Sequence, residues 1–126
     1  ESLYFYTEVL GLEKIKILNE NEKLMKKILN LKKCKLNKIK LGLKNKILIE
    51  LLYFQNLKQK KNKIKIFSPG ITHISLTVKN INKIYKRLKG LKIKFLSEPH
   101  LSNDKKVRLA FCKSPENIFI ELVEVL

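Results

Sequence analysis

The sequence lacks several features that would assign it to other protein classes. Its 126 residues include no tryptophan, one methionine, two cysteines and few acidic residues. No apolar run reaches the roughly 18 residues that a membrane-spanning helix requires. The opening "ESLYFYTEVLG" has neither a methionine nor the hydrophobic region of a signal peptide. We therefore expect no membrane association and a cytoplasmic location, with an organelle as the alternative if a transit peptide has been removed.

Arginine is the scarcest of the basic residues, and this limits what the net charge of +17 implies. A basic patch is the electrostatic signature of phosphate binding, so the charge alone invites a nucleic-acid interpretation. Arg87 and Arg108 are the only arginines, however, and arginine is the residue favoured for base and phosphate recognition. The lysines are spread over the whole length beside abundant asparagine and isoleucine. We expect a solvated basic surface and no specific nucleic-acid partner.

The two cysteines do not form a recognisable site. Cys34 and Cys112 lie far apart in sequence and have neither C-x-x-C nor zinc-site spacing. A disulfide between them remains open, although two free thiols in a reducing compartment are the simpler interpretation. Neither cysteine lies in a motif with a nearby histidine, which is the setting expected of a cysteine nucleophile.

Hydrophobic periodicity predicts alternating helical and extended segments in the first half of the chain. The second helix is expected to turn Leu24, Ile28 and Leu31 toward the core. The predicted segments are a helix over 3–10 ended by Gly11, a strand over 13–18, a helix from a cap at Asn19 or Asn21 to about residue 31, and strands over 34–43 and 45–54 joined by a turn around Lys44–Asn45.

The second half gives the order β-α-β-β-β. Asn80 is placed to cap its helix and Gly90 to end it. The predicted segments are strands over 71–78, 91–98, 105–113 and 117–125, with the helix over 81–90 after the first of them.

The two halves of the sequence resemble each other. "YTEVLGLEKIKIL" (6–18) and "YKRLKGLKIKFL" (85–96) share a tyrosine followed five residues later by Gly-Leu, and then an alternating strand. "ILIELLYF" (47–54) and "IFIELVEV" (118–125) share Ile-Glu-Leu near the end of each half. A period of this size indicates two copies of a β-α-β-β-β unit.

We expect both copies to belong to a single domain over residues 1–126. Module one is expected over about 1–55 and module two over about 64–126. The stretch "NLKQKKNK" (56–63) between them is rich in lysine and asparagine and is the best candidate for a linker. The predicted fold class is therefore α+β, built from two tandem modules.

A glutamate lies inside an apolar strand in each half. Alternation places Glu121 on the same strand face as Phe119 and Val123, and burying an unpaired carboxylate costs several kcal/mol or forces its protonation. Glu50 occupies the equivalent place in the first half. His73 lies on the more polar side of the strand that opens the second half. Carboxylates and an imidazole that converge from strands are suitable ligands for a divalent metal ion, which would neutralise the glutamates.

These residues resemble the vicinal oxygen chelate superfamily, which includes glyoxalase I, methylmalonyl-CoA epimerase, ring-cleaving dioxygenases and bleomycin-resistance proteins. The resemblance covers nearly the whole chain and is carried by "FYTEVLGLE" (5–13), "GITHISLTVKNINKIYKRLKGLKIKFLSEP" (70–99) and "SPENIFIELVE" (114–124). The last segment is similar to the family's Asp-Pro-Asp-Gly-Asn-x-x-Glu-Leu ending, with Ser114 and Glu116 in altered positions.

The resemblance implies a curved eight-stranded mixed sheet around a metal cleft, with ligands on the first and last strands of each module. Glu50 and Glu121 match the last-strand positions, and His73 matches the first-strand position of module two. The first strand of module one, which would carry the fourth ligand, is missing from this sequence. The implied cofactor is a divalent ion such as nickel, zinc, cobalt, manganese or iron.

The ligand set is most similar to that of bacterial-type glyoxalase I. The resemblance then implies a lyase or isomerase that stabilises the enediolate of a small carbonyl–thiol adduct, formed with glutathione or another thiol. Glu121, or Glu50, would act as general base and acid in the proton transfer. A homodimer is also implied, because members of this family often build their clefts from two chains.

Other functions stay open on the same scaffold, because a fold does not fix a reaction. One is a binding or resistance protein that holds a small molecule without a metal and without turnover. Another is an enzyme similar to methylmalonyl-CoA epimerase, and a third is a degenerate copy that has lost its first strand. His100 is expected in a loop as a solvated or pocket-rim residue, and Arg108 is a weak candidate for contact with an anionic substrate.

Overall fold

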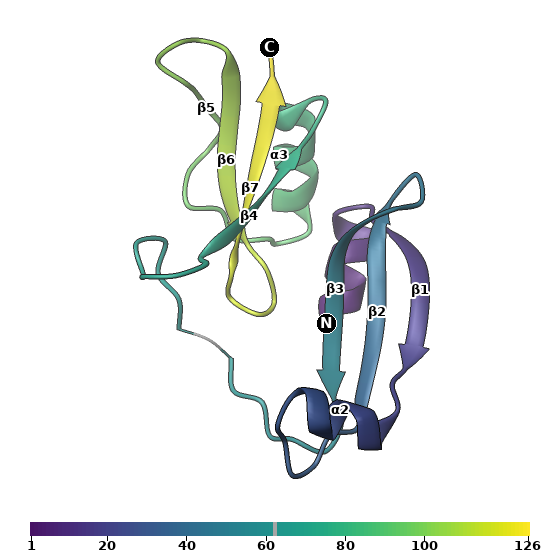
Figure 1. Cartoon of the computed structure of the whole chain (residues 1–126). Coiled ribbons are helices and arrows are strands. Elements are labelled where there is room, and N and C mark those ends of the chain that lie inside the picture. Colours follow the sequence, from purple (N-terminus) through teal and green to yellow (C-terminus); the bar gives the residue numbers. More distant parts are fainter. Residues whose placement is uncertain (62) are drawn as a thin grey trace. The chain divides into compact units, whose positions relative to one another are not determined.

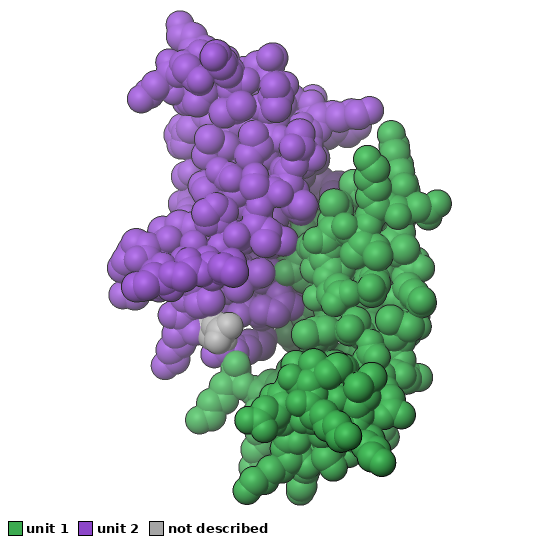
Figure 2. Space-filling view, viewed as in Figure 1, with its two compact units in different colours: residues 1–60 green, residues 61–126 purple. Residues whose placement is uncertain are grey.

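Two sheets with accompanying helices form the α+β structure of this chain (Figure 1). The structure is a computed structural model that describes residues 1–61 and 63–126. The chain divides into two compact units, Glu1–Lys60 and Lys61–Leu126, which Figure 2 colours separately. The division falls inside the linker expected over 56–63, of which Asn62 lies outside the described residues. Among the described residues, no helix is long and apolar enough to cross a bilayer.

Unit 1 opens with a helical segment and continues into a three-stranded antiparallel sheet in the order β1-β2-β3. Gly11 adopts a φ of +81°, and its N–H donates to the Thr7 carbonyl at 2.9 Å, so it ends the first helical segment as expected. The elements of this unit are α1 (Ser2–Tyr4), the π-helical turn η1 (Phe5–Val9), β1 (Glu13–Asn19), α2 (Glu22–Ile28), β2 (Leu36–Leu43) and β3 (Lys46–Phe54).

The helix α2 begins at the expected cap but buries a different side from the one expected. The Asn21 side chain accepts a hydrogen bond from the Leu24 N–H at 2.9 Å. Leu24 and Ile28, which were expected to face the core, are 52% and 61% exposed, and Met25 is buried instead. The expectation was wrong for Leu24 and Ile28, because the core residues Cys34 and Leu36 contact the side of the helix that carries Met25. Leu31, which follows the end of the helix, is partly buried against these residues, as expected. Met25 packs in a small core cluster with Cys34 and Leu36.

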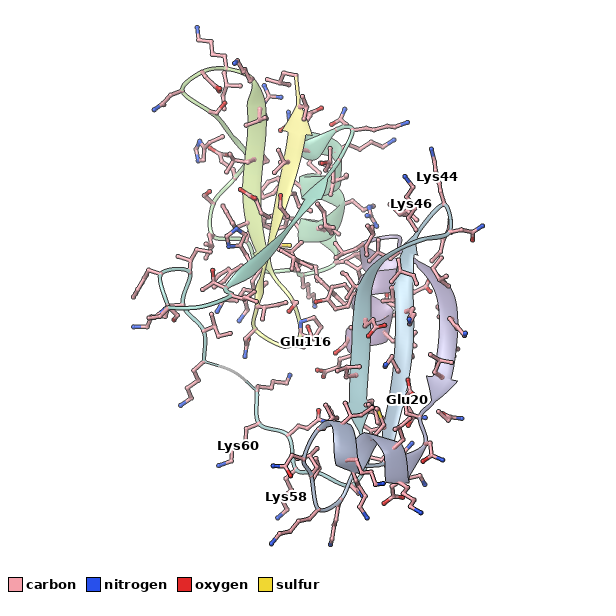
Figure 3. All side chains as sticks on the ribbon, in the orientation of Figure 1. Glu20, Lys44, Lys46, Lys58, Lys60 and Glu116 are labelled. Atoms are coloured by element: carbon pink, nitrogen blue, oxygen red, sulfur yellow. The ribbon has the colours of Figure 1, made fainter. Side chains whose placement is uncertain are left out.

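The hairpin between β2 and β3 turns through Lys44 and Asn45, which have φ values of 50° and 61°. Positive φ at both central residues is typical of the tight turns that join antiparallel strands. Figure 3 shows Lys44 and Lys46 at this turn. The ladder then shifts register between Leu41 and Gly42, and a Cβ on Gly42 would lie only 1.8 Å from the Lys46 carbonyl oxygen. A glycine is therefore required where the bulge brings the two strands close together.

Unit 2 has a four-stranded sheet in the order β4-β7-β6-β5 (Figure 1). The strand β4 runs parallel to β7, whereas the other neighbours are antiparallel. The first strand of this unit therefore lies directly beside its last strand. The elements are β4 (His73–Thr77), α3 (Ile81–Gly90), β5 (His100–Leu101), β6 (Val107–Lys113) and β7 (Phe119–Val125).

The core of unit 2 lies between α3 and one face of this sheet. Ile120 and Leu122 of β7 are fully buried on that face, and Ile81 and Leu88 of α3 are fully buried opposite them. The helix begins where expected, because the Asn80 side chain accepts a hydrogen bond from the Lys83 N–H at 2.9 Å. Alternation then leaves the odd-numbered residues of β4, β6 and β7 on the other side of the sheet.

The strand expected over 91–98 does not form as a full strand. An isolated antiparallel bridge joins Phe95 to Cys112 of β6, with hydrogen bonds from Leu96 N–H to the Phe111 carbonyl and from Lys113 N–H to the Lys94 carbonyl, both at 2.9 Å. The chain then bends, and Pro99 has no N–H with which to continue the ladder. The short strand β5 pairs with β6 in its place. The described residues thus form seven strands in two sheets, and the expected continuous eight-stranded sheet is not seen in them.

Candidate functional site

The residues expected to hold a metal in module two lie on one side of the sheet of unit 2. We call this side the His73 face and define it by His73 and Ser75 of β4, Phe119 and Glu121 of β7, and Phe111 of β6. The register pairs Ser75 with Glu121 and Glu121 with Phe111, so these three side chains form a row across three strands. The same register places His73 beside Phe119, one row away.

His73 begins β4 with an exposed side chain that has two defined neighbours. Its Nδ1 lies 3.1 Å from the hydroxyl of Thr72, a residue that is itself buried. Its ring meets Phe111 edge to face, with 5.5 Å between the ring centroids. Histidine ligands in metal sites have one ring nitrogen engaged in this way, which orients the ring and leaves the other nitrogen for the metal. Nε2 of His73 is therefore the nitrogen available to a ligand.

Glu121 lies in the middle of β7 and is half-buried. Its strand neighbours Ile120 and Leu122 point into the core under α3, so the carboxylate projects from the His73 face and not into that core. In the part of the chain that the structure describes, its carboxylate has no hydrogen-bond or ion-pair partner. A half-buried carboxylate without a partner is costly, and a cation near the His73 face would reduce that cost.

Glu50 lies in β3 of unit 1 and is held by lysines. Its Oε1 is 3.1 Å from Nζ of Lys40, the residue opposite it on β2, and its Oε2 is 3.9 Å from Nζ of Lys38. Lys38 also binds Glu20 at 3.0 Å, and this hydrogen bond raises the pKa of the Lys38 amine. The side chain of Glu50 is 39% exposed, and ion pairs this exposed are weak. Glu50 is thus neutralised without a metal, by contacts that a metal ion is able to displace.

Two of the three expected ligands are therefore brought to one face, and the third lies in the other unit. Within residues 1–61 and 63–126, no three histidine, cysteine, aspartate or glutamate side chains form a group arranged to hold a metal. The donor set of His73 and Glu121 nevertheless fits a divalent ion, because an imidazole nitrogen and a carboxylate oxygen suit zinc, nickel and iron. A carboxylate beside a bound ion is also suited to act as a general base that removes a proton from a carbon atom.

Sequence reasoning missed the side chains that surround this pair on the His73 face. Thr72, Phe111 and Phe119 contact or neighbour His73, and Nζ of Lys113 lies 5.1 Å from the centroid of the Phe119 ring. The only available signal was the alternation of β6, which puts Phe111 and Lys113 on the same side. The strand pairing was needed to connect that side with Glu121.

Arg108 does not lie on the His73 face, and its expected contact with an anionic substrate stays a prediction from the sequence. Alternation places it on the helix side of the sheet, where its Nη1 is 3.8 Å from the Glu124 carboxylate. The same carboxylate accepts a hydrogen bond from the Ile81 N–H at 3.4 Å. Arg108 and Glu124 therefore stabilise the start of α3. His100 is exposed, as expected, but it lies in the short strand β5 opposite Leu109 and not in a loop, because the chain pairs with β6 again after Pro99.

The cysteines are both free and buried, which agrees with two thiols in place of a disulfide. Burial raises the pKa of Cys112 to about 12, so its thiol stays protonated at neutral pH. A protonated, buried thiol is a poor nucleophile and a poor metal ligand.

Comparisons with known proteins identify a family and a common fold. The family model described as the glyoxalase/bleomycin resistance protein/dioxygenase superfamily matches residues 1–122. A glyoxalase family protein from Bacillus cereus has a similar structure with a TM-score of 0.84 and 19% identity, over 99% of this chain and 85% of that one. A search of curated proteins gave no match.

Two glyoxalase I structures are also similar. The trypanothione-dependent glyoxalase I of Leishmania major has a TM-score of 0.70 and 19% identity, over 98% of this chain and 76% of that one. Glyoxalase I from Zea mays has a TM-score of 0.68 and 17% identity, over 98% of this chain and 42% of that one. At these identities the structures establish a common fold and leave the reaction open.

Proposed function

Because the chain belongs to the glyoxalase/bleomycin resistance protein/dioxygenase superfamily, we propose that it is a metal-dependent, glyoxalase I-like lyase or isomerase. The observation that carries the proposal is that His73 and a half-buried Glu121 lie on one sheet face in neighbouring rows, where the carboxylate lacks a partner among the described residues. The proposed substrate is a small carbonyl–thiol adduct, with glutathione or another thiol as the carrier.

We propose that His73, Glu121 and Glu50 supply ligands to a divalent ion. When bound, such an ion would act as a Lewis acid toward the oxygens of the adduct. Glu121 would take the proton from the carbon beside the carbonyl and return it to the neighbouring carbon, as general base and then acid. Thr72 would keep the His73 ring oriented, and the partly exposed Phe111 would offer apolar surface next to the reacting carbons.

The remaining finer expectations belong to the same proposal. They are a single domain over residues 1–126, an eight-stranded sheet completed by a first strand, and a fourth ligand on that strand. The homodimer and the cytoplasmic or organellar location stay predictions from the sequence.

Turnover measured against two matched variants tests this function. The purified chain is stripped with a chelator, reloaded with nickel, zinc, cobalt, manganese or iron, and assayed on hemithioacetals of glutathione and on acyl-CoA epimers. Glu121→Gln should lower kcat by at least about a hundredfold, the usual scale for loss of a general base. Glu124→Gln, three residues along the same strand but beside α3, is the control. Equal activity in wild type and Glu121→Gln, or activity that survives without metal, contradicts the proposal.

One observation favours a second function, that of a binding protein without turnover. Glu50 already has cationic partners in Lys40 and Lys38, so one of the expected ligands does not require a metal for its neutralisation. The discriminating result is ligand binding by the chelator-treated chain at the same affinity as by the metal-loaded chain, without conversion of the ligand. A thermal shift with thiol adducts, with and without chelator, separates the two functions.

A further inference from the structure

The two most exposed large apolar side chains among the described residues lie close together, in the loop that leads into β4 (Figure 1). We call residues 63–71 the Phe67 loop. Phe67 is 77% exposed and Ile71 is 87% exposed. Single exposed apolar residues are common on protein surfaces, but two of them in one short loop form a local apolar surface that needs an explanation. Both precede β4, so neither belongs to the His73 face.

The Phe67 loop contains a turn that its own hydrogen bonds close. Ser68 N–H donates to the Lys65 carbonyl at 2.9 Å, and Lys65 N–H donates to Ser68 Oγ at 3.0 Å. The two central residues of this turn are Ile66 and Phe67, so Phe67 lies at its tip. Nζ of Lys65 lies over the Phe67 ring, 5.4 Å from its centroid. The turn therefore presents an aromatic side chain outward with a cation beside it, and binding requires little further ordering of the backbone.

The Phe67 loop is also cationic. Lys63 and Lys65 are exposed, as is Lys61 shortly before them. No acidic residue occurs between Glu50 and Glu98, a stretch that contains twelve lysines and arginines. The positive charge of this part of the sequence is thus not offset by carboxylates of its own.

Apolar side chains at the tip of a loop, with lysines beside them, match the chemistry of a bilayer with anionic headgroups. The apolar groups enter the boundary between headgroups and acyl chains, and the lysines stay among the negative headgroups. Such a surface is a diffuse array of charges, which attracts lysine and arginine alike. A nucleic acid would favour arginine, and Ile71 has no ring on which a base stacks. The observations therefore favour a lipid surface over a nucleic acid.

We propose that the Phe67 loop docks unit 2 reversibly onto anionic lipid bilayers, with Phe67 and Ile71 inserted and with Lys63 and Lys65 among the headgroups. The expectation of no membrane association was based on the lack of a spanning segment and of a leader. A spanning helix needs about 20 apolar residues, whereas docking at a bilayer surface needs only a small apolar surface with basic neighbours. Docking of this kind is independent of the proposed reaction, because it uses no residue of the His73 face.

Sedimentation of the full chain with lipid vesicles tests the proposal. Vesicles rich in phosphatidylserine should bind the chain, and vesicles of phosphatidylcholine alone should bind it at least about tenfold more weakly. Phe67→Ser should weaken binding to the anionic vesicles by at least about tenfold, because the inserted ring is lost. The double variant Lys63→Gln with Lys65→Gln should weaken it by about 25-fold, which is about fivefold for each lysine.

A second pair of lysines provides the matched control for charge. Lys79 and Lys83 are exposed and follow β4, whereas the Phe67 loop precedes it. The length of β4 exceeds a Debye length, so Lys79→Gln with Lys83→Gln removes the same charge without affecting the docked loop. This variant should bind within about twofold of the wild type.

The insertion of the loop is measurable directly, because the chain contains no tryptophan. The emission of Phe67→Trp should shift to shorter wavelength with the anionic vesicles and should be quenched by lipids with brominated acyl chains. Leu101→Trp places the same reporter at an exposed position of β5 in the same unit. It should show neither change.

Four outcomes would overturn the proposal. They are no binding of the wild type to anionic vesicles, equal binding by wild type and Phe67→Ser, equal losses in the two double-lysine variants, and equal responses of the two tryptophan variants. The substituted side chains are exposed, so none of these changes removes a core contact, and circular dichroism of each variant verifies that it is folded.

Discussion

Glu50 and Glu121 occupy the same place in the same strand motif, yet their surroundings differ. Glu50 lies opposite a lysine and forms ion pairs with Lys40 and Lys38 on the neighbouring strand. Glu121 lies in a row with Ser75 and Phe111, neither of which carries a charge, and is half-buried. The motif is therefore the same, and the strands on either side decide what the carboxylate is able to do.

The two strands also differ in how completely they are covered. β7 is flanked by β4 and β6 and packs against α3, whereas β3 is flanked by β2 alone among the described strands. A repeated motif is thus central in one unit and at an edge in the other. The same substitution at matching positions of β3 and β7 should therefore have different effects on stability.

The largest effect is expected from the leucine that follows each glutamate. Leu122→Ala should lower the free energy of unfolding by about 2–5 kcal/mol, because Leu122 is 1% exposed in the core under α3. Leu51→Ala should cost clearly less, because Leu51 is only partly buried. Chemical denaturation of both variants measures the difference. Equal losses of stability would mean that Leu51 of β3 is as well packed as Leu122 of β7, which would contradict the difference in coverage between the two strands.

A smaller effect is expected from proline at the residue two positions after each glutamate. Val123→Pro removes an N–H on the side of β7 that bonds to β4, and should cost on the order of 1–3 kcal/mol. Leu52→Pro removes an N–H that points away from β2, since Gln55, an odd number of residues further on, donates its N–H to the Lys35 carbonyl beside β2. This change should cost less than about 1 kcal/mol. Thermal unfolding of the two variants provides the measurement. A Leu52→Pro variant as unstable as Val123→Pro would show that β3 has a partner on its outer side.

The smallest effect is expected from the lysine opposite Glu50. Lys40→Met removes the closer ion-pair partner and leaves stability within about 1 kcal/mol, because the pair is exposed. If Glu50 is a metal ligand, the loss of its ion pair with Lys40 should strengthen metal binding by up to about fivefold, because about 1 kcal/mol corresponds to about a fivefold change in affinity. Isothermal titration provides the measurement, with Lys16→Met as the control on the neighbouring strand. Unchanged affinity in both variants would remove Glu50 from the ligand set.

Local signals predicted most of the elements correctly. Asn21 and Asn80 cap helices, Gly11 ends the first helical segment, and the chain turns at Lys44–Asn45. These signals act over a few residues, and the pattern of the sequence displays them directly. The buried side of α2 was predicted wrongly because it depends on Cys34 and Leu36, which lie beyond the helix.

The neighbours of the two glutamates could not be predicted from the sequence, because they depend on the register in which adjacent strands pair. A two-residue turn at Lys44–Asn45 alone would place Glu50 opposite Ile39. The bulge beside Gly42 shifts the ladder by one residue, so that Lys40 lies opposite Glu50 instead. Such a shift reverses which side chains meet, and no pattern in the strand itself revealed it.

The most direct test of the proposed metal centre is the metal content of the chain, measured by mass spectrometry on protein purified without an affinity metal and then reloaded. Matched histidines separate the site from adventitious binding, because His73 lies on the same sheet face as Glu121, one row away, and His100 is exposed in β5. We expect near-stoichiometric nickel, zinc, cobalt, manganese or iron in the wild type and in His100→Ala, and loss of the ion in His73→Ala and Glu121→Gln. Absence of metal from every protein after reloading, or equal metal in both histidine variants, would contradict the account.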